Sequence, residues 1–116
     1  LQALTLWNDA VFFECAQQLA RRIVDEVPRV LNETPLRDRI QYGFQLCLTR
    51  SPTAAEQSAV TKLFDQQQEL CQQDPVAAKA LLGSTPVSPG TTTEELAAWV
   101  LVARTLLNLD EFITKE

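Results

Sequence analysis

One stretch near the end of the chain, Leu96–Leu107, constrains the fold more than any other part of the sequence. Every position in it is apolar except Arg104 and Thr105. A helix that is apolar on all sides has to be enclosed by other elements of the protein. At about 18 Å as a helix, the stretch is too short to cross a hydrocarbon core of about 30 Å. We therefore expect a central core helix and no membrane insertion.

Capping residues and prolines predict four more helices around this one. Apolar residues recur at helical spacing in each, and Thr53 with Glu56 and Thr92 with Glu95 form capping boxes. The predicted helices begin after Asn8-Asp9 (ending at Pro28), Thr34-Pro35, Thr53, Asp74-Pro75 (ending at Gly83) and Thr92. Their predicted inward faces are Phe12, Cys15, Ala16, Leu19, Ile23 and Val27; Leu36, Ile40, Phe44, Cys47 and Leu48; Ala59, Val60, Leu63, Phe64, Gln67, Leu70 and Cys71; and Val76, Ala80 and Leu81. The predicted fold is all-α: a compact bundle of four to five helices in a single domain, residues 1–116, around the apolar C-terminal helix.

Composition excludes several classes of function. The net charge is −5 and the longest basic cluster is Arg21-Arg22, which argues against a nucleic-acid partner because phosphate binding needs a basic face. The chain has no histidine. Ser-His-Asp and Cys-His catalysis, His-ligated metals and a C-x-x-C-H haem site are therefore ruled out.

The three cysteines, Cys15, Cys47 and Cys71, are odd in number and widely spaced. A disulfide framework favours an even number at close spacing, so we expect small buried hydrophobic residues. One disulfide stays open as an alternative if the chain is exported.

Adjacent carboxylates are the other chemically active groups. They form the pairs Asp25-Glu26, Glu94-Glu95 and Asp110-Glu111. Neighbouring residues on a helix point about 100° apart, so such pairs do not converge on a substrate or a cation. Glu94-Glu95 is explained by the positive end of a helix dipole. We expect no catalytic residue, no metal site and no cofactor, and hence no enzyme.

Arg104 is the single charge within the apolar stretch, and a buried guanidinium must be paired. We expect Asn108 to end the helix in the left-handed conformation and Asp110 to cap a final short turn. The predicted site is thus a polar clasp that fixes the C-terminal tail. The alternative is a contact to a small anionic or carbohydrate ligand, for which three aromatic residues offer stacking surfaces. The clasp residues are Arg104, Asn108, Asp110 and Glu111, and the aromatic residues are Trp7, Tyr42 and Trp99.

Several segments together carry a resemblance to a known family. They are Ala3–Asp9, Arg39-Ile40, Leu48–Thr53 with Glu56, Trp99 and Ala103–Thr114. In this order and spacing they resemble the C-terminal domain of unknown function in a large family of planctomycete proteins. Many members of that family carry an N-terminal planctomycete-type cytochrome c module. The resemblance covers essentially the whole chain, and its last segment is the most specific.

The resemblance implies an exported, multidomain parent protein located in the periplasm or the cell envelope. No cofactor is implied, because the family's haem motif is absent from this chain. The missing methionine at position 1 fits a C-terminal piece of such a protein. We therefore expect a non-catalytic structural or docking module whose partners are the upstream domains. Such a module should expose an apolar patch that includes Phe13, since Phe12 and Phe13 cannot both face one core. The alternative is a binding module for a small anionic or carbohydrate ligand near the end of the last long helix.

Overall fold

The fold is all-α, as predicted. The computed structural model describes the backbone of residues 2–28 and 33–114 and the side chains of residues 11–28 and 33–109. These residues form helices and loops without a strand. The helices are α1 (Gln2–Glu26), α2 (Pro35–Leu48), α3 (Ala54–Gln73), α4 (Pro75–Leu82) and α5 (Thr93–Thr114).

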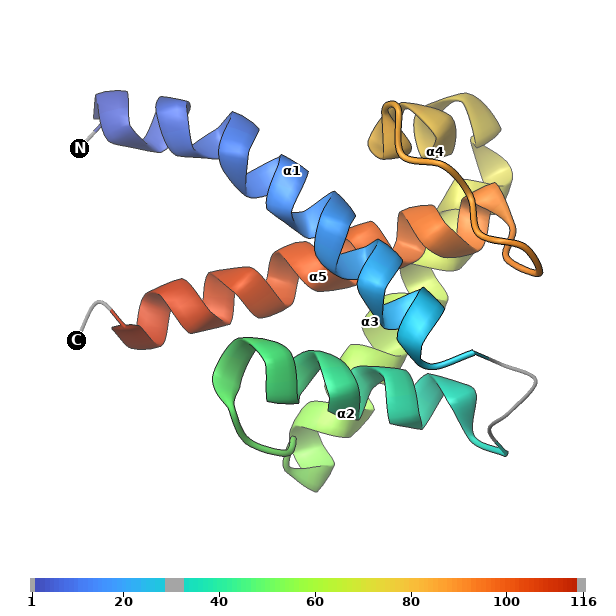
Figure 1. Cartoon of the computed structure of the whole chain (residues 1–116), viewed down its shortest axis with the longest axis horizontal. Coiled ribbons are helices and arrows are strands. Elements are labelled where there is room, and N and C mark those ends of the chain that lie inside the picture. The colour runs from blue at the N-terminus through green and yellow to red at the C-terminus, as the bar shows by residue number, and fades with distance from the viewer. Residues whose placement is uncertain (1, 29–32, 115–116) are drawn as a thin grey trace.

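The apolar helix α5 is central, again as predicted. It packs against all four other helices, and in Figure 1 it runs through the middle of the molecule, with α1 crossing it. Its residues from Leu96 to Val100 are fully buried. The Trp99 ring lies against Phe64 of α3, with 4.8 Å between the ring centroids. Burying large apolar side chains contributes about 1.5–3 kcal/mol each, and α5 supplies more buried apolar residues than any other helix.

Several helix boundaries follow from the predicted capping residues. The Thr53 hydroxyl accepts a hydrogen bond from the Glu56 backbone N–H at 3.1 Å, and the Thr53 N–H donates to the Glu56 carboxylate at 2.9 Å. This confirms the first capping box. Asp74 accepts from the Ala77 N–H at 3.2 Å, and Thr92 accepts from the Glu95 N–H at 3.1 Å. Thr34 differs: its hydroxyl donates to the Asp38 carboxylate at 3.4 Å and does not cap α2.

Two predicted boundaries are wrong. The first helix begins at Gln2, well before Asn8-Asp9, and α5 continues past Asn108 to Thr114. In both places the sequence lacks glycine and proline and contains good helix formers such as leucine and alanine or glutamate. Residues suited to capping are tolerated inside a helix when their neighbours favour helical backbone, and Asn108 is one of them.

The predicted inward faces are correct for most of the core but fail at five positions. Core positions that match include Ala16, Ile23, Ile40, Phe44 and Phe64. Two helices pack through residues outside the predicted faces. Ala20 and Val24 extend the buried face of α1, and α4 packs through Ala78 and Leu82, on the side opposite Val76 and Ala80. The five predicted inward residues that are instead exposed are Cys15, Ala59, Leu70, Val76 and Ala80.

Candidate functional site

The structure places the predicted clasp residue Arg104 at the surface. Val102, Ala103 and Leu106 are buried, and Arg104 points to the opposite side of α5. The Arg104 guanidinium lies over the Phe13 ring, 5.8 Å from the ring centroid. The prediction that this guanidinium is buried is therefore wrong, and its pairing with Asp110, whose side chain lies outside the described residues, stays a prediction. The apolar run is enclosed on the side that carries Leu106, and it is open where Arg104 emerges.

The other predicted site residues do not assemble around Arg104 within the described side chains. Asn108 is exposed and lies inside α5. The side chains of Asp110 and Glu111 lie outside the described residues, as does that of Trp7. Trp99 is fully buried and Tyr42 packs against the core. Neither of these two rings is available to stack on a ligand beside Arg104.

The most deeply buried charged side chains of the described region are those of Arg39 and Glu95, and their pairing was not predicted from the sequence. The Arg39 guanidinium donates to the Glu95 carboxylate at 3.0 Å and to the Val27 backbone carbonyl at 2.8 Å. Only 4% of the Arg39 side chain and 7% of the Glu95 side chain are exposed. This pair therefore joins the end of α1, α2 and the first turn of α5. A signal was present: Arg39 directly precedes Ile40 on the apolar face of its helix.

A second Arg–Glu pair, Arg50 with Glu56, lies at the surface. The Arg50 guanidinium donates twice to the carboxylate, each time at 2.8 Å, and lies 5.6 Å from the centre of the Phe44 ring. Hydrogen bonds from Arg50 and from the Thr53 backbone lower the pKa of Glu56 from 4.5 to about 2. The pair reinforces the capping box at the start of α3.

The last turn of α4 and the loop between α4 and α5 are each fastened to α1. The Gln17 side chain donates to the Leu81 carbonyl at 2.8 Å. Further along, the Ser88 hydroxyl donates to the Asp25 carboxylate, which also accepts from Arg21 at 3.1 Å. Glu26 accepts a hydrogen bond from Arg22 at 3.1 Å, so both carboxylates of the Asp25-Glu26 pair make structural hydrogen bonds.

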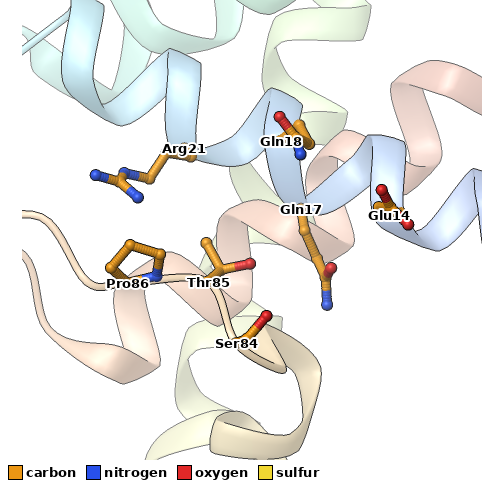
Figure 2. A pocket seen from close by; sticks show the side chains of 7 residues that line it. All are labelled: Glu14, Gln17, Gln18, Arg21, Ser84, Thr85 and Pro86. Carbon is orange, nitrogen blue, oxygen red and sulfur yellow. The ribbon is translucent and has the colours of Figure 1, made fainter.

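Between these two fastenings lies a polar cleft of about 410 Å³. One wall is α1, and the other is the loop at Ser84, Thr85 and Pro86. Figure 2 shows Gln17 reaching from α1 towards the loop and Arg21 standing beside Pro86. We name this the α1–loop cleft, and its lining residues are Glu14, Gln17, Gln18, Arg21, Ser84, Thr85 and Pro86.

No two of the three cysteines, all of which lie in the described part of the chain, are joined in a disulfide. Cys15 is exposed, Cys47 is half-buried and Cys71 is buried. Burial raises the pKa of the Cys71 thiol, and the carboxylates of Glu94 and Asp74 add to this effect. The expectation of buried cysteines is therefore correct for Cys71 and wrong for Cys15, which lies on the outer side of α1.

Within the described parts of the chain, no three cysteines or carboxylates come together in a way that would hold a metal ion. No helix in those parts combines the length and apolar character needed to span a bilayer.

Comparison with known proteins gives one family. Residues 1–64 match the family model described as "PSD1: Protein of unknown function (DUF1553)". The match covers 64 of the 116 residues, which are α1, α2 and the first half of α3. The chain therefore belongs to this family of unknown function. The segment from Ala103 to Thr114 lies outside the match. No curated protein and no solved structure is significantly similar to the chain.

Proposed function

We propose that this member of the PSD1 family is a non-catalytic helical module that docks onto neighbouring domains of a larger protein. The proposal rests on exposed apolar side chains of α1 and α5. They lie towards the end of the molecule where α1 begins and α5 ends (Figure 1). Phe13 of α1 faces Arg104 of α5, so residues before Phe13 and after Arg104 lie towards that end.

The surface is formed by side chains that the fold leaves open. Val11 is 46% exposed and Leu109 is 37% exposed. Phe12 and Phe13 are half-buried, and Phe13 also packs against the core. Apolar side chains grouped at one surface favour burial against a partner. We define the α1–α5 patch as Val11, Phe12, Phe13 and Leu109. The proposed occupant is the upstream part of the same parent protein.

The test adds the upstream domains of the parent protein to this domain in trans. We expect association by analytical ultracentrifugation and a higher Tm of the mixture, because a partner that binds only the folded state stabilises it. Replacing both Val11 and Leu109 with aspartate should abolish the association.

The chain offers a matched control for that double variant. Leu70 and Val76 are 55% and 80% exposed and lie on α3 and α4, away from the α1–α5 patch. Leu70→Asp with Val76→Asp should leave the association intact. If the domains do not associate, or if both double variants lose association equally, docking through this patch is refuted.

A second candidate function is contact with a small anion at Arg104. Its exposed guanidinium, stacked over Phe13, has the geometry of an accessible cationic site. Titration with acetate or phosphate, followed by NMR, should then shift residues near the end of α5. Arg104→Ala should remove these shifts while the domain stays folded. Shifts that persist in the variant would exclude this candidate.

Location in the periplasm or cell envelope is part of the same proposal. It follows from the resemblance to exported planctomycete-type proteins. Fractionation of the source cells, with an antibody against the domain, tests it directly: recovery in the cytoplasmic fraction would contradict it.

A further inference from the structure

We infer that the α1–loop cleft is a binding site for an uncharged, hydroxyl-rich ligand of the carbohydrate class. The cleft lies between α1 and the α4–α5 loop. It is therefore distinct from the α1–α5 patch, which lies where α1 begins and α5 ends. Its volume of about 410 Å³ falls within the range of small-molecule sites in proteins.

The walls of the cleft carry groups that both donate and accept hydrogen bonds. Gln18 offers a carboxamide, and Ser84 and Thr85 offer hydroxyls. These three side chains make no hydrogen bond within the described part of the protein. In Figure 2 the two hydroxyl oxygens point to the side on which Gln17 lies. A sugar hydroxyl also donates and accepts, so it matches amides and hydroxyls better than a purely anionic or purely cationic ligand does.

The charges around the cleft disfavour an anionic ligand. Glu14 contributes a negative charge and Arg21 a positive one. The Arg21 Nε already donates to the Asp25 carboxylate at 3.1 Å, so this arginine attracts an incoming anion less strongly. The many uncharged polar groups of the lining match an uncharged, hydroxyl-rich ligand. The Pro86 ring adds a small apolar surface for the C–H face of a sugar.

The site is held in place before any ligand arrives. The Gln17 carboxamide fixes the Leu81 carbonyl, and Ser88 fastens the other end of the loop to Asp25. Between them, the Thr85 N–H donates to the Leu82 carbonyl at 2.9 Å. Gly83 supplies the turn at φ 57°, a conformation that favours glycine. A preformed cleft avoids much of the cost of ordering a loop on binding.

The experiment is an NMR titration of the ¹⁵N-labelled domain with cellobiose, maltose and N,N′-diacetylchitobiose in turn, with galacturonate and phosphate as anionic probes. We expect at least one neutral disaccharide to shift the amide signals of residues 14–21 and 84–86. Affinity in the millimolar range is expected, because the cleft has hydrogen-bonding groups but no aromatic platform. A soluble polysaccharide of the same sugar should bind more weakly per residue if the cleft accepts only short or terminal sugars. Equal binding would identify an internal segment of a polymer as the ligand.

The test variant is Gln18→Ala with Thr85→Val, which removes two of the polar groups without touching either fastening of the loop. It should weaken binding about fivefold or more. The matched control, Gln66→Ala with Thr61→Val on α3, makes the same two changes away from the cleft and should leave binding unchanged. The proposal fails if no neutral sugar shifts these signals, if only the anions do, or if the control variant loses binding equally.

Discussion

The two halves of α5 hold a charged side chain in different surroundings. Near the start, Glu95 is almost completely buried and accepts a hydrogen bond from Arg39. Towards the other end, Arg104 is exposed and lies over Phe13. From the sequence, Arg104 was the residue expected to be buried and paired, and Glu95 the residue explained by the helix dipole. The comparison teaches that an apolar run does not show how far around the helix its neighbours extend.

The reason for the difference lies in what surrounds each end. The start of α5 is covered by the ends of α1 and α2 and by the side of α3, so the carboxylate of Glu95 is shielded from water. Further along, α5 and α1 extend together beyond the other helices (Figure 1). A side chain on the outer face there reaches water. The predictions below test this contrast, beginning with the largest expected effect.

Glu95→Ala should lower the free energy of unfolding by about 3–5 kcal/mol, because it removes the carboxylate that pairs with the buried Arg39 guanidinium. Urea unfolding followed by circular dichroism measures the loss. Glu94→Ala, at the adjacent half-buried position, should cost less than about 1 kcal/mol, since it removes only a dipole interaction.

A double replacement makes the first test more specific. Arg39→Met combined with Glu95→Leu should recover much of the lost stability, since it removes both charges at once. Equal losses for Glu95→Ala and Glu94→Ala would show that Glu95 is as solvated as its neighbour. The difference in burial between Glu95 and Arg104 would then have no effect on stability.

Leu106→Ala and Leu109→Ala compare apolar side chains on the same helix. Leu106 is fully buried, and its side chain lies where α2 approaches closely at Gly43. Truncating it should cost about 2–5 kcal/mol, because a cavity remains. Leu109 is 37% exposed, so the same change should cost about 1 kcal/mol or less. Thermal unfolding of the two variants gives the comparison, and similar Tm values would contradict it.

Much of the fold was predictable because local signals and burial agree. Prolines, caps and helical periodicity gave the five helices, and the Thr53–Glu56 box is formed as expected. The apolar character of Leu96–Leu107 correctly identified the central helix. Local sequence was misleading where a polar residue suited to a helix end, such as Asn8 or Asn108, lies among good helix formers.

Little of the candidate site was predictable, for a different physical reason. Arg39 and Glu95 are far apart in the sequence, and only the packing of α2 against α5 brings them to 3.0 Å. The α1–loop cleft likewise combines residues near Gln17 with residues near Thr85. No local pattern shows which faces of two helices will meet. A charged residue beside an apolar face, such as Arg39 before Ile40, is the local feature that indicates a buried and paired charge.

The Arg50–Glu56 pair lies at the surface, so it shows what an ion pair contributes to stability without burial. The pH dependence of the unfolding free energy measures this contribution. The pKa of Glu56 falls from 4.5 to about 2 in the folded state, so its contribution to stability is complete above pH 4.5 and is lost as the pH falls towards 2. Glu56→Gln should flatten the unfolding free energy in this window. Gln can still cap the helix, so the loss at neutral pH should be small.

Arg50→Gln is the control for this titration. It removes the largest cause of the lowered pKa, so the pH-dependent loss should be smaller and should end closer to the ordinary pKa of Glu56. Unfolding curves at a series of pH values measure both effects. An unchanged pH profile in both variants would show that this exposed pair does not couple to folding.

Arg104→Ala should have the smallest effect, less than about 1 kcal/mol, because it removes an exposed contact between a cation and an aromatic ring. The clasp expected from the sequence would instead cost several kcal/mol. A double-mutant cycle with Phe13→Leu separates the two, since the cation–ring contact couples Arg104 to Phe13 and a clasp does not. A large loss that is independent of Phe13 would place an acidic partner of Arg104 in the tail. In that case Arg104 would be ion-paired as Glu95 is, and the two charged residues of α5 would no longer differ.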